Sequence, residues 1–476
     1  MTLRAQLARI VGGERVCDAP ALPETHPQDS TPKPWLVVSP AASQQVQQVV
    51  RLCARQQVPL VPSSSGVHSH GTPLPRDGGI VLDLRRMDRV LAVDPENRVV
   101  RVEPGVTWGR LQDHLEGYGL RGLIPLLPHP QKSALTSTLE REPMLIPRFE
   151  YGEPLLTLEV VFGTGEVLRT GAACVGEGGI AQGVQPEGPG LDFFRLLQGA
   201  QGTMGVVTWA TLKVEHLPRT DRVFFFALDA PEGAVALLYR LGRLMLGHEC
   251  LLLNRLNLAL ILAREPKKEL EGVLGRLPPW ALLVVLSGAP RRPQESVAYQ
   301  EEALLNMATE LGLGLGLGLG PLGSLPGASG AELPRRLRRP WDGEGYWRFN
   351  YRGACQDLCF ITTLDKAPEM VATLRGVAGK AWEGVGVYLQ PLEQGRACHL
   401  EFNFYHRESK AERQAANTLS RAAAQAVLDR GALFTRPYGF LAGLVYPQAQ
   451  DYTAALKKVK ALLDPSDILA PGRLCF

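Results

Sequence analysis

The chain has 476 residues, of which 45% are hydrophobic and 21% are charged, and this composition predicts a globular protein with a large core divided into two or three domains. The net charge of +3 gives no case for a nucleic-acid partner. Without an apolar run of roughly eighteen residues or a signal-peptide core, we expect a cytoplasmic protein with no membrane span.

The N-terminal region predicts one short helix at about 3–11 and then an irregular Pro-, Thr- and Asp-rich segment. From Trp35 the pattern is β-α-β, because apolar runs flank a stretch in which apolar residues recur at helical spacing. The expected strands lie at 36–38, 60–61 and 80–82, and the expected helix lies at 46–55. Ser43 precedes that helix and is its expected N-cap.

The loop from Val61 to Gly71 reads VPSSSGVHSHG and lies between the second and third of these strands. A short run of Ser and Gly leaves backbone N–H groups free of bulky side chains, and such groups can surround a pyrophosphate. A plain connector is the alternative, since Ser and Gly are common in turns of every kind. The surrounding β-α-β pattern favours the phosphate-binding interpretation.

The region from 89 to 208 predicts a hairpin around 94–97, a helix from Trp108 and a second pair of strands turned at 163–166. Its expected strands lie at 89–93, 98–103, 155–162 and 167–169. The Gly-rich segment 176–190 is predicted to be a mobile loop. Two glycines three apart in GAQGTMGVVT, which spans 199–208, suit a backbone pressed close to a ligand.

Beyond residue 218 strands and helices alternate in the manner of a separate α+β sheet domain. Strands are expected at 223–228, 281–286, 358–362 and 397–404, and helices at 232–246, 296–311, 367–381 and 411–428. The low-complexity run LGLGLGLGLGPLG from Leu311 is predicted to be a loop, because alternating Gly disfavours both helix and strand. A helix near 452–463 and the segment DPSDILAPG close the chain.

The chain contains eight cysteines without CxxC spacing, which predicts neither a disulfide framework nor a metal cluster. Buried thiols are the better interpretation for most of them. They are Cys17, Cys53, Cys174, Cys250, Cys355, Cys359, Cys398 and Cys475.

Taken together, these segments resemble the flavoproteins of the vanillyl-alcohol oxidase and p-cresol methylhydroxylase family over most of 35–218 and from about 395 to the C-terminus. The resemblance implies an α+β fold with a PCMH-type FAD-binding domain of two α+β subdomains and an antiparallel-sheet cap over the substrate. It places the FAD-binding domain at 1–218, the cap at 219–430 and a C-terminal segment that returns to the FAD domain at 431–476.

The same resemblance implies a set of residues that bind FAD, drawn from the Ser/Gly loop, the TSTLE segment, the GTMGVV segment and the C-terminal region. They are Pro62, Ser63, Ser64, Ser65, Gly66, Val67, His68, Gly71, Pro104, Thr136, Ser137, Glu140, Gly202, Gly205, Val206, Val207 and Arg436. Relatives that link FAD covalently carry a histidine in this loop, and its position is that of Val67 when the loops are aligned on Gly66. We therefore expect FAD to be bound non-covalently.

The catalytic residues implied by the resemblance are Arg436, Glu150 and Tyr438. The segment TLEREPMLIPRFEYG is similar to a family pattern in which Glu150 falls where an Asp borders the flavin. Arg436 matches a family Tyr-Arg pair whose tyrosine is replaced here by Thr435, with Tyr438 close by. A second family tyrosine is absent from HSHGTPLP, which puts a phenol substrate in doubt. A surface or ion-paired arginine and a solvated loop carboxylate are the alternatives for Arg436 and Glu150.

His399 and His406 have the six-residue spacing of a metal-binding motif found in 2-hydroxyacid dehydrogenases of this fold. The residues between them are LEFNFY rather than a turn. On an uninterrupted strand, His399 and Glu401 share one face while His406 points to the other, so the three would not reach one ion. We therefore predict no metal site, and a metal-assisted 2-hydroxyacid dehydrogenase remains a minor alternative.

The resulting hypothesis is an enzyme, an FAD-dependent oxidase or dehydrogenase that transfers hydride from a small alcohol or hydroxy acid to flavin. Arg436 would stabilise charge on the reduced flavin, and Glu150 would serve as a base. The alternative is an FAD-binding structural or electron-transfer subunit of a larger redox complex. The expected partners are a small-molecule substrate, a redox partner protein as electron acceptor, and a second copy of the chain in a homo-oligomer.

Overall fold

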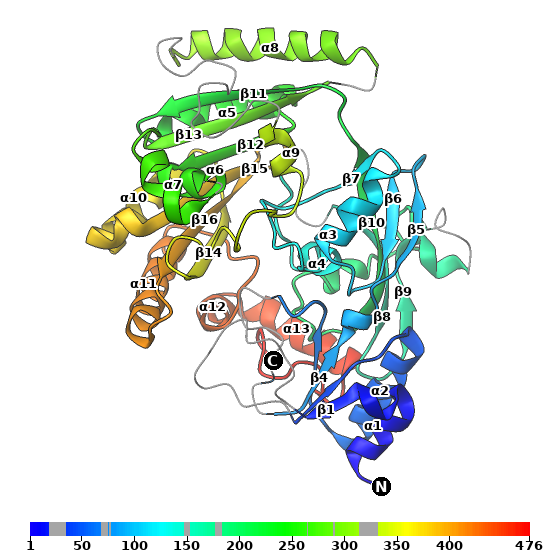
Figure 1. Cartoon of the computed structure of the whole chain (residues 1–476). Helices are drawn as coiled ribbons and strands as arrows, with labels where there is room; N and C mark the ends of the chain where they lie inside the picture. Colours follow the sequence, from blue (N-terminus) through cyan, green and yellow to red (C-terminus); the bar gives the residue numbers. More distant parts are fainter. Residues whose placement is uncertain are drawn as a thin grey trace.

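A computed structural model of the chain shows three sheets with helices packed around them (Figure 1). The structure describes residues 1–18, 35–67, 75, 78–146, 153–176, 183–263, 265–288, 291–313 and 332–476. His68, Gly71, Glu150 and the run from 314 to 331 lie outside the described residues.

The first sheet is formed by the N-terminal β-α-β region and has the strand order β1-β2-β4-β3. Strands β2, β4 and β3 are parallel, and β1 joins β2 antiparallel. Its elements are α1 (Leu3–Val11), β1 (Val16–Asp18), β2 (Leu36–Val38), α2 (Ser43–Gln56), β3 (Leu60–Ser63) and β4 (Ile80–Asp83). Parallel strands are buried on both faces, which is why LVV and IVLD are nearly continuous apolar runs.

Ser43 is not the N-cap of α2, contrary to the sequence prediction. It is the first helical residue, and Ala42 occupies the cap position without a side-chain hydrogen bond. The Ser43 hydroxyl is used elsewhere, since its hydrogen bond to Glu159 contributes to lowering the pKa of that carboxylate against the opposing effect of burial. The Gln45 side chain instead accepts the Ala41 N–H, just ahead of the helix, at 2.8 Å.

The second sheet is antiparallel and has the order β5-β6-β10-β8-β9, with β7 paired to β10. Its strands are β5 (Val90–Asp94), β6 (Val99–Val102), β7 (Leu120–Gly122), β8 (Leu155–Val161), β9 (Val167–Arg169) and β10 (Val206–His216). Helices α3 (Trp108–Glu116) and α4 (Ala134–Leu139) belong to the same region. The two predicted hairpins, 89–103 and 155–169, are confirmed by the β5-β6 and β8-β9 pairings.

The third sheet has the order β11-β13-β12-β15-β16-β14, and all its pairings are antiparallel. Its strands are β11 (Asp221–Leu228), β12 (Glu249–Asn254), β13 (Trp280–Ser287), β14 (Ala354–Thr362), β15 (Val385–Leu392) and β16 (Ala397–His406). Its helices are α5 (Glu232–Leu244), α6 (Arg255–Leu262), α7 (Pro266–Leu274), α8 (Pro293–Glu310), α9 (Glu332–Leu337), α10 (Ala367–Ala378) and α11 (Lys410–Leu428). The two central strands, β12 and β15, were not foreseen. The α+β class with an antiparallel cap sheet is confirmed.

The two faces of this third sheet differ in character. Phe224 and Phe226 of β11 pack with α5, α8, α10 and α11 in one apolar cluster, whereas Val223 and Phe225 pack on the opposite face with α6, α7 and α9. In β16 the even-numbered residues from 398 to 404 are apolar and join the face covered by α5, α8, α10 and α11. The odd-numbered residues from 399 to 405 lie on the other face, against which side chains from 126–145 also pack.

The C-terminal segment contacts both halves (Figure 1). Leu433 forms a bridge to Ile361 of β14, and α12 (Phe440–Val445) packs beside α11. Helix α13 (Gln450–Leu463) then packs on the core of the second sheet, and Leu469 forms a parallel bridge with Leu60 of β3. The last residues therefore extend the first sheet beside the Ser/Gly loop.

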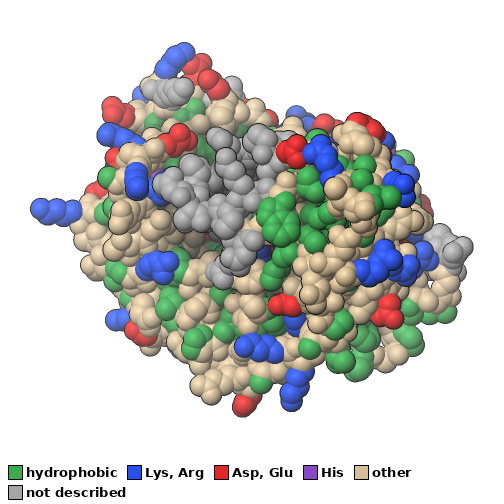
Figure 2. Space-filling view, turned by 90° about the horizontal axis from the view of Figure 1, so that it is seen from below, with side chains coloured by type: hydrophobic (Ala, Val, Ile, Leu, Met, Phe, Trp, Pro, Cys, Tyr) green, Lys and Arg blue, Asp and Glu red, His purple; other side chains and the backbone are tan. Residues whose placement is uncertain are grey.

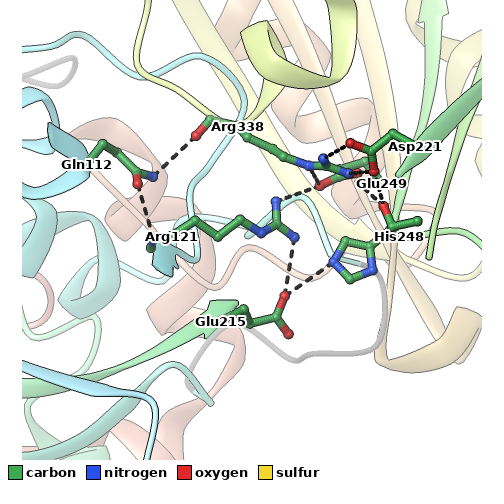
Figure 3. Close-up of polar contacts among 9 residues, drawn as sticks. Gln112, Arg121, Glu215, Asp221, His248, Glu249 and Arg338 are labelled. Atoms are coloured by element: carbon green, nitrogen blue, oxygen red, sulfur yellow. Dashed lines mark hydrogen bonds and ion pairs between the residues drawn. The ribbon is translucent and has the colours of Figure 1, made fainter. Parts of the chain in front are cut away.

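A buried cluster of ion pairs joins the second sheet to the third (Figure 3). Arg121 of β7 donates to Glu249 of β12 at 2.7 Å and to Glu215 of β10 at 3.2 Å. Arg338, which follows α9, donates to both carboxylate oxygens of Glu249 at 2.7 and 2.8 Å and pairs with Asp221 of β11 at 2.6 Å. The side chains of Arg121 and Glu249 are only 3% and 1% exposed. The two sheets are thus held in one relative position by opposite charges removed from water.

Figure 2 shows a face on which lysine and arginine side chains are interspersed with aspartate and glutamate. The described part of this face therefore has no extended area of one charge. Within the described ranges, no helix combines the length and the apolar composition that crossing a lipid bilayer requires.

Candidate functional site

A groove runs between the first and second sheets, with an empty volume of about 720 Å³. It is lined by residues of the Ser/Gly loop, of α4 and of the 199–207 segment. Eight of the predicted FAD-binding residues line it, namely Pro62, Ser64, Pro104, Thr136, Glu140, Gly202, Gly205 and Val207. Leu84, Leu135, Leu139, Leu197, Ala200 and Gln201 complete the lining and were not predicted.

Hydroxyl groups fix the start of the Ser/Gly loop against α4. The Ser64 hydroxyl lies 2.6 Å from the hydroxyl of Thr136, and the Ser65 hydroxyl accepts the Ser133 N–H at 3.1 Å. Ser133 is the N-cap of α4 and donates its own hydroxyl to the carbonyl of Pro104 at 2.6 Å. These bonds explain why small hydroxyl residues occupy the loop, and they hold its backbone along one wall of the groove.

The 199–207 segment forms the opposite wall and requires glycine at Gly202. Its φ of +78° is unfavourable for other residues, and a Cβ there would lie 2.6 Å from Cγ of Pro62. Lys460 of α13 holds the segment from behind, because its ammonium donates to the carbonyls of Thr203 and Leu469, both at 2.9 Å. The backbone at Gly202 is thereby held so close to Pro62 that no side chain fits at this position.

The other predicted FAD-binding residues that the structure describes lie around this groove without lining it, while His68 and Gly71 are outside the described ranges. Ser63 and Val206 are buried in their strands, and Gly66 has a φ of +78° in the loop. The Ser137 hydroxyl accepts the indole N–H of Trp108 at 2.9 Å within the core. Ser65 supports the loop as described, while Val67 and Arg436 line a second, adjacent cavity.

The second cavity lies between the 125–143 segment and the face of the third sheet that carries the odd-numbered residues of β16, with an empty volume of about 970 Å³. One wall comes from 125–143 and carries Lys132 and Glu142, which form an ion pair. The sheet supplies Asp357 and Cys359 of β14, Tyr388 of β15 and Glu401 of β16. The 346–349 segment adds Tyr346, Arg348 and Phe349. Apart from Val67 and Arg436, none of these lining residues was singled out from the sequence as part of the cofactor or catalytic site.

The polar face of the third sheet forms a connected network behind this cavity. Arg348 pairs with Asp357 at 3.0 Å and with Glu401, and Asn403 donates to the same two carboxylates at 2.7 and 2.8 Å. His399 contacts the other oxygen of Glu401 at 3.1 Å. Burial would raise the pKa of Glu401, but Arg348 and His399 hold it well below its ordinary value. Glu401 is therefore a fixed anion, and a proton acceptor must come from elsewhere.

The alternation of strand β16 could have revealed part of this network. In HLEFNFYH the polar residues His399, Glu401 and Asn403 occupy every second position. A polar face on a strand whose other face is apolar indicates a wet or functional surface. The contributions of Arg348 and Asp357 could not be inferred this way, because they reach the cavity from other parts of the chain.

The predicted geometry of His399 and His406 is observed. Strand β16 is uninterrupted from Ala397 to His406, and His399 and Glu401 share one face. His406 lies at the end of the strand and contacts the carbonyl of Arg407 at 2.8 Å. Burial lowers the pKa of His399, which is therefore a neutral ring near pH 7.

Arg436 connects the cavity with the groove. Its side chain is 8% exposed, lines the cavity and donates from Nη2 to Sγ of Cys359 at 2.9 Å. Its charge acts on Glu140, which lines the groove, and on Glu142, which lines the cavity. Tyr438 lies two residues further on, with its N–H bonded to the Arg436 carbonyl at 2.9 Å, and it lines neither space. Arg436 is thus a buried cation at the junction of the two spaces.

The residues around the groove fit a dinucleotide. Two backbone segments approach each other where Gly202 faces Pro62, and the Oε2 atom of Glu140 is buried without a hydrogen-bond partner among the described residues. A ligand bound there could supply the missing partner. The model for an FAD binding domain matches residues 34–132 of this chain. The chain therefore carries an FAD binding domain, and the Ser/Gly loop lies within it.

Two solved structures share this fold over nearly the whole chain. The structure matches p-cresol methylhydroxylase with substrate bound at a TM-score of 0.82 and 19% identity, covering 99% of this chain and 96% of that one. It matches 4-ethylphenol oxidase from Gulosibacter chungangensis with the same score, identity and coverage. The chain therefore has the fold of p-cresol methylhydroxylase, as the sequence resemblance implied, and carries an FAD binding domain within it.

Curated relatives are similar over a shorter part of the chain. Glycolate oxidase subunit GlcD of Bacillus subtilis (strain 168) is 30% identical over 240 residues, which are 49% of this chain and 48% of that protein. Mitochondrial D-lactate dehydrogenase [cytochrome] of Arabidopsis thaliana is 31% identical over 220 residues, 44% of this chain and 37% of that protein. The matched region spans about half of the first relative and less of the second.

We expect Gly202→Val to weaken FAD binding by roughly tenfold or more. The new Cβ would collide with Pro62 and displace one wall of the groove, and a cost of about 1.4 kcal/mol in binding is a factor of ten in affinity. Titration of the apoprotein with FAD, followed by fluorescence quenching, measures the effect. Gly376→Ala in α10 is the control, since its Cβ meets nothing within 4 Å and its affinity should be unchanged. Equal affinity in Gly202→Val and the native protein would show that the groove does not hold FAD.

Proposed function

We propose that this chain is an FAD-dependent oxidoreductase that takes a hydride from a small hydroxy acid or alcohol, with FAD held non-covalently in the groove. The observation that carries the proposal is the position of Arg436. Its guanidinium lines the cavity, and its charge reaches Glu140 in the adjoining groove. A substrate in the cavity would therefore face a flavin ring in the groove, with this cation beside both.

Flavin, when bound, supplies a two-electron acceptor and becomes more negative as it accepts hydride. Arg436 is suited to stabilise that charge, because it is buried, always protonated and held by neighbouring groups. The substrate carbon loses its hydrogen with the bonding electrons, and the hydroxyl proton passes to a base. Glu150 remains our predicted base, and Tyr438 remains a candidate for positioning.

The cavity walls suit a small polar substrate. Lys132 and Arg348 line it already paired with the carboxylates Glu142, Asp357 and Glu401, while Arg436 and the phenol groups of Tyr346 and Tyr388 also line it. Arg436 and the two phenols could bind a carboxylate and a hydroxyl through charged and neutral hydrogen bonds. The names of the relatives, glycolate oxidase subunit and D-lactate dehydrogenase, are consistent with a 2-hydroxy acid. Tyr346 and Tyr388 were not predicted from the sequence. Because they could bind a phenol in place of the two missing family tyrosines, a phenol remains an alternative substrate.

The test is anaerobic reduction of the purified FAD-loaded protein by a panel of donors. We expect glycolate or D-lactate to bleach the flavin absorption, while L-lactate and 4-ethylphenol act much more slowly. If 4-ethylphenol alone bleached the flavin, the substrate would be a phenol and not a hydroxy acid. Acid precipitation in the same experiment should release all the flavin into the supernatant, and retention in the pellet would overturn non-covalent binding.

Failure of every donor would overturn the proposed activity while leaving FAD binding intact. The protein would then be better described as an electron-transfer or structural flavoprotein subunit. Co-purification of a second redox protein that reduces the flavin directly would support that alternative.

A further inference from the structure

Glu140 lies where the groove meets the cavity. It follows α4 and lines the groove beside Thr136 and Leu139. Two residues further along the chain, Glu142 lines the cavity, as does Lys132. The reactive ring of a flavin would have to lie at this junction to face a substrate in the cavity. Among the described residues that line the groove, Glu140 is the carboxyl group placed beside that ring.

The surroundings of Glu140 leave one of its oxygens available. Oε2 is buried and has no hydrogen-bond partner among the described residues, although the residue as a whole is half-buried. The charged groups that act on it are Lys132, Arg436, Glu142 and Arg473. Burial raises the pKa of Glu140 to about 7, against the opposing effect of the three cations. Glu142 behaves differently, because Lys132 and Arg436 outweigh its burial and lower its pKa.

We propose that Glu140 contacts the flavin ring and takes up a proton from solvent when the flavin is reduced. This inference rests on the proposed binding of FAD in the groove, but it does not depend on the substrate. Two-electron reduction with one proton adds one negative charge to the ring. The nearby Glu140 carboxylate then binds a further proton at an oxygen, which relieves the repulsion between two anions. Glu140 thereby couples electron transfer to proton uptake and tunes the redox potential of the flavin.

The direction of the pH effect follows from these charges. The protein's own groups leave Glu140 ionised above a pH of about 7. Negative charge on reduced flavin raises the Glu140 pKa further, so the extra proton is taken up between the two pKa values. Below that pH interval Glu140 carries a proton whether the flavin is oxidised or reduced. Above the interval Glu140 is ionised in both cases.

The experiment is a redox titration of the FAD-loaded protein with dithionite and indicator dyes from about pH 6 to 9. The pH dependence of the midpoint potential gives the number of protons bound per two electrons. We expect the native protein to bind close to one proton more than Glu140→Gln just above pH 7. Glu142→Gln is the matched control, because Glu142 stays ionised in this range. Since Glu142 also raises the pKa of Glu140, its removal should move the uptake of the extra proton to lower pH without abolishing it.

Equal proton numbers in the native protein and Glu140→Gln at every pH would overturn the inference. Absence of the extra proton from Glu142→Gln at every pH would assign the effect to Glu142 instead and equally overturn the inference. No substrate is used, so these outcomes are distinct from failure of the donor panel. A protein that takes up no FAD would instead overturn the proposed function itself.

Discussion

Replacing Arg436 by alanine is expected to slow reduction of the flavin by substrate by roughly 10²- to 10³-fold, the range found when one preorganised charge-stabilising group is removed from an active site. Arg436 lies 8% exposed at the junction of groove and cavity, where solvent cannot replace its charge. Rapid-mixing measurements of flavin absorption under anaerobic conditions, with saturating substrate, give the rate directly.

Two further variants separate the charge of Arg436 from its packing. Arg436→Lys keeps a cation but loses the planar guanidinium, so it should recover part of the rate. Cys359→Ser alters the partner at 2.9 Å from Nη2 and leaves the guanidinium in place, so its rate should remain within a few-fold of native. Native rates in an Arg436→Ala protein with full FAD content would contradict a role for this arginine in the chemistry.

The second large effect concerns stability. Glu249→Gln is expected to destabilise the protein by about 3–5 kcal/mol, because Arg121 and Arg338 would remain buried with much less compensating charge. The cluster joins the second and third sheets, so the loss should also loosen the cavity between them (Figure 3). Denaturant unfolding monitored by tryptophan fluorescence measures the change.

The matched control is Glu116→Gln. Glu116 of α3 pairs with Arg339 at 3.2 Å across the same interface, but both side chains are 43% exposed. Exposed ion pairs contribute about 0–1 kcal/mol to the free energy of unfolding, so this variant should be almost as stable as the native protein. Comparable destabilisation in the two variants would mean that burial of the Glu249 cluster is not the source of the effect.

The same cluster predicts an acid-dependent loss of stability. Burial would raise the pKa of Glu249, but Arg121 and Arg338 lower it to about 2, below its ordinary value of 4.5. A carboxylate whose pKa is lowered by folding contributes stability above its unfolded pKa and loses it as pH falls towards the folded value. The difference in stability between native and Glu249→Gln proteins should therefore shrink between about pH 4.5 and pH 2.

Local sequence patterns were sufficient where the determinants are local. The hairpins around 94–97 and 163–166 were predictable, because turn residues and alternating strands specify them within a dozen residues. The glycines around Gly202 likewise indicated a close approach of the backbone before its partner, Pro62, was known. Strands β12 and β15 were missed because they are buried on both faces, so their apolar runs resemble those of a helix.

The sequence by itself determined the α+β class, the β-α-β start with its Ser/Gly loop and the identity of the cofactor domain, since each of these depends on residues close together in the chain. The composition of the cavity was decided by the tertiary structure. Tyr346 and Arg348, Asp357, Tyr388 and Glu401 come from separate elements, and they meet because an antiparallel sheet turns one face of β14, β15 and β16 towards the FAD-binding half. Side-chain alternation fixes which residues share a face, but packing of two distant parts of the chain determines what that face encloses.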